Sequence, residues 1–121
     1  QFGIRSGDKS EFVWGREHVF THKFDLNDLE TALARLRGRP VYLTVDLDVL
    51  DPSVFPGTGT PEPGGVTFDA LRAALTEACN ALHIVAADVN ELSPHYDPTG
   101  ASTAVACKIV RELLIGIRAL G

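Results

Sequence analysis

The chain has 121 residues, 45% of them hydrophobic, which is the usual size of one domain and enough to bury a core. Its formal net charge of −5 argues against a nucleic-acid or anionic-membrane surface, because both need clustered Lys and Arg. No apolar run approaches the ~20 residues that span a bilayer, and the start shows neither a signal-peptide pattern nor an initiator Met. We therefore expect a cytoplasmic chain cut from something longer, with part of its site elsewhere.

The first half of the chain predicts two strands and a helix. Residues 1–5 form a strand candidate, and residues 9–20 give only weak helical support. Leucines at helical spacing predict a helix that begins at Asp25, a suitable N-cap, and ends at Gly38, a suitable C′ residue. Residues 41–48 predict a strand, whose apolar and β-branched content suits a parallel sheet covered on both faces.

The second half continues the alternation of strands and helices. In chain order, the patterns predict a Pro/Gly-rich loop over 52–65, a helix from about Thr67, a strand over 84–89, a second loop over 91–98 and a helix over 102–118. This order favours an α/β class with a mainly parallel sheet and right-handed crossovers.

Asp46 and Asp48 stand where the predicted strand gives way to polar sequence. Residues two apart in a strand point to one face, about 6.6 Å apart at a rise of ~3.3 Å per residue. Open α/β sheets bind ligands at the carboxyl ends of strands, and two like charges there are costly unless a cation holds them. Hard divalent cations prefer such oxygens. The alternative is that both aspartates cap the loop, with Asp51 beginning a turn at Pro52.

The sequence rejects one common loop motif and disfavours another. A calcium loop of the EF-hand type needs Asp or Asn at its fifth position and Gly at its sixth, where this chain has Leu50 and Asp51. The glycine-rich residues 56–65 lack the third glycine of the dinucleotide fingerprint, and no Gly-Lys-Ser/Thr follows. We interpret this loop as a wall beside the site, with an ordered surface loop as the alternative.

Asp88 and Glu91 follow the second buried strand as the aspartate pair follows the first. Both strand ends would face one crevice in a parallel sheet. A carboxylate there can accept a charge-assisted hydrogen bond from a cationic substrate. A solvated acid at the start of a loop is the alternative for each residue.

The cysteines and histidines give weaker indications. Cys79 and Cys107 lie among apolar neighbours in helical segments and are expected to be free, buried thiols. Zinc binding is disfavoured because neither cysteine has a partner at finger spacing. We expect a surface location for His18, His22 and His83, while a role at the rim of the site is open for His95.

Taken together, these motifs resemble the ureohydrolase (arginase/agmatinase) family over nearly the whole chain. The resemblance rests on five runs, namely residues 3–6, 46–52, 56–65, 88–94 and 96–98. It implies a three-layer α/β/α fold with a mainly parallel sheet. It also implies that residues 1–121 are the C-terminal portion of a single ureohydrolase domain.

The resemblance also implies a site with two Mn²⁺ ions that share a hydroxide. Asp46 matches the carboxylate that bridges both ions, and Asp48 matches one that binds a single ion. Glu91 matches the acid that pairs with the substrate guanidinium, while Thr60, in substrate binding, and Asp88 are expected as neighbours of the site. The remaining ligands, two histidines and further aspartates, are expected outside this chain, so the piece alone should be inactive.

The activity implied by this resemblance is hydrolysis of agmatine to putrescine and urea, a step of polyamine biosynthesis. The expected partners are a small cationic guanidino substrate and further copies of the chain in a trimer or hexamer, without nucleic acid or membrane. Two alternatives stay open. One is another ureohydrolase, such as an arginase or a guanidinobutyrase, and the other is a non-catalytic metal-binding or assembly module.

Overall fold

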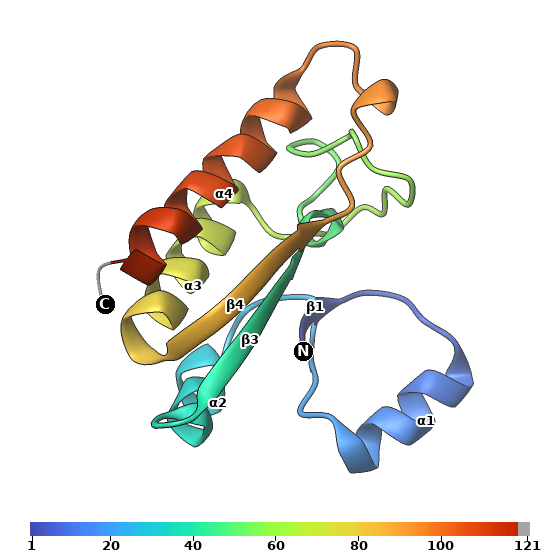
Figure 1. The fold of residues 1–121 in the computed structure, drawn as a ribbon. Coiled ribbons are helices and arrows are strands. Elements are labelled where there is room, and N and C mark those ends of the chain that lie inside the picture. The colour runs from blue at the N-terminus through green and yellow to red at the C-terminus, as the bar shows by residue number, and fades with distance from the viewer. Residues whose placement is uncertain (119–121) are drawn as a thin grey trace.

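The structure is a computed structural model that describes residues 1–118 and confirms the α/β class (Figure 1). Its regular elements are, in chain order, β1 (Phe2–Ile4), α1 (Lys9–His18), β2 (His22–Lys23), α2 (Leu29–Leu36), β3 (Pro40–Asp46), α3 (Phe68–Ala81), β4 (His83–Asn90) and α4 (Ala101–Arg118). Two short 3₁₀ turns, η1 (Leu47–Val49) and η2 (Pro94–Tyr96), follow β3 and β4.

The strands pair in parallel, as the sequence predicts. β3 lies beside β4, and β1 lies beside β2 in a second two-stranded sheet. Thr44 lies opposite Asp88, and Asp46 lies opposite Asn90, so the carboxyl ends of β3 and β4 meet at one edge. Figure 1 shows the loops that follow these strands gathered at that edge.

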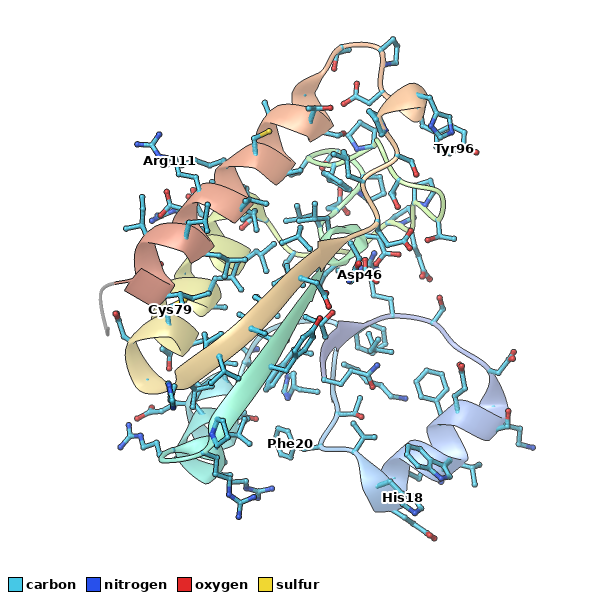
Figure 2. The ribbon with its side chains drawn as sticks, viewed as in Figure 1. His18, Phe20, Asp46, Cys79, Tyr96 and Arg111 are labelled. Carbon is cyan, nitrogen blue, oxygen red and sulfur yellow. The ribbon has the colours of Figure 1, made fainter. Side chains whose placement is uncertain are left out.

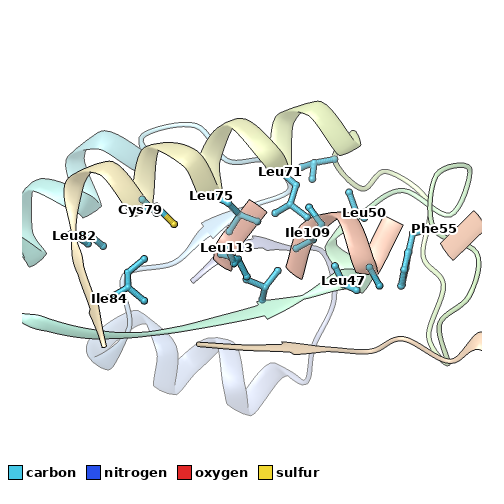
Figure 3. Close-up of a cluster of buried hydrophobic side chains, with 14 of the residues drawn as sticks. Leu47, Leu50, Phe55, Leu71, Leu75, Cys79, Leu82, Ile84, Ile109 and Leu113 are labelled. Carbon is cyan, nitrogen blue, oxygen red and sulfur yellow. The ribbon is translucent and has the colours of Figure 1, made fainter. Parts of the chain in front are cut away.

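Helices α3 and α4 pack side by side over one face of the β3–β4 pair (Figures 1 and 3). The predicted helix stripe is confirmed, because Leu71, Leu75 and Cys79 of α3 are all buried. Ile109 and Leu113 of α4 face them in the same cluster. Each such side chain contributes about 1.5–3 kcal/mol through burial, so this cluster fixes the helices on the sheet.

The predicted start of the second helix is wrong. Helix α2 begins at Leu29, and its N-cap is Asp28, which has a left-handed φ of 58°. Asp25 instead accepts hydrogen bonds from the backbone and side-chain nitrogens of Asn27, at 2.9 and 2.8 Å. This local turn competes with helix formation and delays it. The predicted end is confirmed, since Gly38 follows the C-cap with a φ of 76°.

The cysteine prediction is half right. Both cysteines are free, but Cys79 is 2% exposed whereas Cys107 is exposed on α4. Cys107 stands between Ala106, which is buried, and Lys108, which is exposed, so it lies off the buried stripe of the helix. None of the helices in residues 1–118 combines the length and the apolar character that crossing a membrane requires.

Candidate functional site

Asp46 and Asp48 lie together, but not by the strand geometry predicted for them. Strand β3 ends at Asp46, and Asp48 lies in the turn η1 instead of on the pleat. Asp46 is the N-cap of that turn, because its Oδ1 accepts a hydrogen bond of 3.1 Å from the backbone nitrogen of Asp48. Leu47 between them is fully buried. The cap, and not the alternation of a strand, keeps the two carboxylates adjacent.

Thr60 holds the second carboxylate from the Pro/Gly-rich loop. Its hydroxyl donates a hydrogen bond of 2.9 Å to Oδ2 of Asp48. Within residues 1–118, Oδ2 of Asp46 and Oδ1 of Asp48 accept no hydrogen bond. Each carboxylate therefore keeps one oxygen available for another partner.

At the edge where β3 and β4 end, the ionised form of Asp46 is disfavoured beside the other carboxylates. Partial burial is the main cause that raises the pKa of Asp46 to about 6, and repulsion from the carboxylates of Asp48 and Glu91 adds to it. The hydrogen bond from the backbone nitrogen of Asp48 opposes the rise. The three predicted acids are thus close enough to interact, and a bound cation would relieve their repulsion.

Glu91 is the first residue after β4 and has an unusual backbone. Its φ is 68°, a left-handed conformation that costs a non-glycine residue about 1–3 kcal/mol. The side chain is exposed at the edge where Asp46 ends β3. Residues held in such conformations concentrate at functional sites, so this strain agrees with a site at the edge.

Asp88 is the centre of a hydrogen-bond network on the sheet. Its carboxylate accepts hydrogen bonds from the hydroxyl of Tyr42, from the hydroxyl of Thr44 at 2.7 Å and from the side-chain nitrogen of Asn90 at 2.6 Å. The hydroxyl of Tyr42 is the largest cause that lowers the pKa of Asp88. Asp88 is therefore already satisfied by its neighbours, and it lies two register pairs from Asp46 on the other strand.

Asp51 organises the loop after the turn, as the capping alternative expects of it. Its carboxylate accepts hydrogen bonds from the hydroxyl of Ser53 at 2.5 Å and from the backbone nitrogen of Gly64 at 2.8 Å. The hydroxyl of Ser53 is the main cause that lowers the pKa of Asp51 to about 2. A Cβ on Gly65 would lie 2.5 Å from the carbonyl carbon of Leu50, so only glycine allows this backbone approach.

A second anchor joins the two loops, and sequence reasoning missed it. The backbone nitrogen of Gly57 donates a hydrogen bond of 2.8 Å to Oγ of Ser102. The backbone nitrogen of Ser93 donates one of 2.7 Å to the carbonyl of Gly57. Asp97 accepts a hydrogen bond of 2.7 Å from the backbone nitrogen of Ser102. An acid two residues before Thr99 is a turn signal that could have indicated part of this anchor.

Arg5, near the start of the chain, contacts the turn η1 that carries Asp48. Its Nη2 donates a hydrogen bond of 2.6 Å to the carbonyl of Asp48, and its Nη1 donates one of 3.0 Å to the carbonyl of Val49. The nearest of these partners is 43 residues away in sequence. No spacing or periodic pattern could have predicted the contact.

The histidines differ in their surroundings. His18 stacks on Trp14 with ring centroids 4.2 Å apart, and Figure 2 shows it far from Asp46. His95 lies against Tyr96, and its proposed rim role stays a prediction. In the described part of the chain, no group of three or more His, Cys, Asp and Glu side chains is arranged to hold a metal ion.

Comparisons with known proteins place this chain in a family. The chain is 47% identical over 118 residues to an agmatinase of Bacillus anthracis, which covers 95% of this chain and 41% of that protein. It is 35% identical to a guanidinobutyrase of Pseudomonas aeruginosa, which covers 94% of this chain and 39% of that protein. The chain thus spans about two fifths of the length of these relatives.

The fold agrees with these relatives. The native structure of an arginase from Bacillus caldovelox matches with a TM-score of 0.80 at 30% identity, over 93% of this chain and 41% of that one. The predicted arginase-like fold, present here in part, is confirmed. The model of the Arginase family matches residues 1–116, and the chain therefore belongs to the arginase family.

Proposed function

We propose that this chain contributes one part of a guanidino hydrolase site that converts agmatine and water to putrescine and urea. The observation that carries the proposal is the pair of carboxylates at the end of β3, each with one oxygen to spare, beside Glu91 at the end of β4. Agmatine is the first choice because the agmatinase relative is more similar to this chain than the guanidinobutyrase is.

The donor atoms of the site fit a divalent cation such as Mn²⁺. Carboxylate oxygens suit hard cations, and repulsion from Asp48 and Glu91 adds to the burial that raises the pKa of Asp46, which supports a bound cation between them. We assign Asp46 and Asp48 as ligands of two Mn²⁺ ions and place the remaining ligands outside this chain. Bound ions of this kind lower the pKa of coordinated water and so supply hydroxide near neutral pH.

Glu91 has a separate task in this proposal. A guanidinium carries a delocalised positive charge, and a carboxylate at the edge of the site can bind it through charge-assisted hydrogen bonds. Holding the cation there aims its central carbon at the nucleophile, and such positioning can supply ~7–11 kcal/mol of a barrier in favourable cases. Thr60 contacts Asp48, so it contributes to the same site by holding a ligand, and its predicted substrate contact remains a proposal.

The experiment uses the natural full-length protein. Urea release is measured with agmatine, arginine and 4-guanidinobutyrate at equal concentrations in the presence of Mn²⁺. We expect agmatine to be preferred, while preference for 4-guanidinobutyrate would favour the second candidate, a guanidinobutyrase. No urea from any of the three would contradict the proposed function.

Two substitutions separate the assigned roles. Asp48→Ala should lower the bound Mn²⁺ and abolish urea release, because it removes a ligand. Glu91→Gln should keep the Mn²⁺ content and raise the KM for agmatine, because it weakens only the substrate contact. Loss of Mn²⁺ in the Glu91 variant would show that its role is assigned wrongly.

A non-catalytic metal-binding or assembly module is the remaining alternative. Calorimetric titration with Mn²⁺ separates it from the enzyme, since two tight sites in the full-length protein support the enzyme. Assembly into trimers or hexamers also remains a proposal, and sedimentation of the same sample measures it.

A further inference from the structure

Arg5 is the residue on which a further inference rests. It follows β1, and its side chain is half-buried against the turn η1, which carries Asp48. Its two terminal nitrogens donate to the carbonyls of Asp48 and Val49, at 2.6 and 3.0 Å. Its Nε is buried without a hydrogen-bond partner among the described residues. The polar contacts of this guanidinium are thus directed at the turn.

The turn needs such a donor. Carbonyls in the last turn of a helix lack partners within the helix, and η1 is one turn long. The carbonyl of Val49 also accepts a hydrogen bond of 2.9 Å from the backbone nitrogen of Val66, whereas Arg5 supplies the contact at Asp48. A planar guanidinium reaches two neighbouring carbonyls at once with a permanent charge, which a lysine ammonium does less well.

The neighbours of Arg5 strengthen the same contact. A Cβ on Gly3 would clash with the side chain of Val49, so β1 lies directly on the turn. Ser6 donates a hydrogen bond of 2.7 Å to Oε2 of Glu62, two residues after Thr60. The segment 3–6 therefore braces both the turn that carries Asp48 and the loop whose threonine binds its carboxylate.

We infer that Arg5 is a positioning residue, which holds the backbone of Asp48 so that its carboxylate is presented to a divalent cation. This inference rests on the proposed function. Arg5 holds the backbone carbonyl of Asp48 while Thr60 holds its Oδ2, so the residue is fixed at its backbone and at one carboxylate oxygen, and Oδ1 stays available. Partners of this kind typically change metal affinity by about 10–100-fold when they are removed.

The test compares Arg5→Lys and Arg5→Ala with the wild-type full-length protein by calorimetric titration with Mn²⁺. Arg5→Lys should weaken one Mn²⁺ site by about tenfold, and Arg5→Ala should weaken it further. Urea release should fall at low Mn²⁺ and recover at saturating Mn²⁺, with the KM for agmatine changed by less than about threefold. A role in folding alone would lower the melting temperature and leave the Mn²⁺ affinity of the folded protein unchanged, so the titration and a thermal melt together separate the two roles. Arg39→Ala is the matched control, since Arg39 is exposed at the opposite end of β3.

Two outcomes would overturn the inference. The first is Mn²⁺ affinity within about twofold of wild type in both Arg5 variants, which would leave Arg5 a purely structural residue. The second is a wild-type protein that binds no Mn²⁺ and releases no urea, which would remove the proposed function and this inference with it. If Arg5→Ala does not fold, Arg5→Lys alone decides, because it keeps the charge and loses only the forked contact.

Discussion

The backbone nitrogen of Asp48 donates a hydrogen bond of 3.1 Å to Oδ1 of Asp46. This bond makes Asp46 the cap of the turn η1. Oδ2 of Asp46 accepts no hydrogen bond within residues 1–118. The two interpretations of the aspartate pair, as a cap of the loop and as ligands of a cation, are therefore compatible. One oxygen of Asp46 serves the fold, and we assign the other to a cation.

Asp46→Asn should separate these two tasks. The amide oxygen of asparagine can still cap the turn, and the substitution removes a partly buried negative charge, so the metal-free protein should melt at or above the wild-type temperature at pH 7. The lost charge should weaken Mn²⁺ binding by at least about tenfold. Asp46→Ala loses the cap as well and should cost a further ~0.5–2 kcal/mol of stability. Calorimetric titration and thermal melts test both, and wild-type Mn²⁺ affinity in Asp46→Asn would refute the ligand assignment.

Asp88→Asn should change the ionisation of Tyr42. The hydrogen bond to the carboxylate of Asp88 is the main cause that raises the pKa of the Tyr42 phenol above its ordinary value of 10.0. Without that negative charge the phenol should ionise at lower pH. Absorbance of tyrosinate in an alkaline titration measures the change, and Tyr42→Phe identifies which component belongs to Tyr42. An unshifted component in Asp88→Asn would contradict the network.

Asp97→Asn should reduce stability in a way that depends on pH. Hydrogen bonds from Ser102 and then Thr99 lower the pKa of Asp97 in the folded protein. A lowered pKa stabilises the fold fully above the unfolded value of ~3.9, and this contribution is lost as the pH falls through the folded value. The variant should therefore melt roughly 5–10 °C below wild type at pH 7. The difference in melting temperature between the variant and the wild type should shrink below about pH 4.

Thermal melts between pH 3 and pH 7 measure that difference. Glu17→Gln is the control, because Glu17 is exposed on α1 and its carboxylate makes no hydrogen bond or ion pair with the described residues. A difference for Asp97→Asn that stays constant across the range would mean that the charge of Asp97 is not the source of the stability.

Gly65→Ala should destabilise the loop between β3 and α3. The added Cβ would lie 2.5 Å from the carbonyl carbon of Leu50 and 2.6 Å from the carbonyl oxygen of Val49, so the backbone has to shift. Overpacking of this kind costs about 1–3 kcal/mol. Gly59→Ala is the matched control, since nothing lies within 4 Å of its added Cβ. Equal unfolding midpoints for the two variants in denaturant would contradict the close approach.

The regular elements could be predicted where one pattern acts alone. The stripe of α3 is buried as its spacing predicts, because helix period and core position agree there. The start of α2 was predicted wrongly because Asp25 is a good cap in isolation but bonds to Asn27 in the structure. The end of β3 was predicted two residues late, because the cap at Asp46 turns the chain before the apolar pattern ends.

The candidate site, too, could be predicted only in part. The location of Asp46, Asp48 and Glu91 at one edge follows from the strand ends, and a parallel sheet brings those ends together. The contacts of Arg5 and Ser102 join distant segments through backbone atoms, which every residue possesses. Such contacts depend on the folded shape and leave no signal in the order of residue types.

The link from Arg5 to Asp48 has a consequence for the order of folding. The 43 residues between the two are about as many as the 44 that separate Thr44 from Asp88 in the β3–β4 pair. Both contacts carry a similar loop-closure cost, so we expect them to form together. Ion capture should then require both closures, so that the arrival of bound Mn²⁺ in a refolding experiment reports on completed tertiary structure.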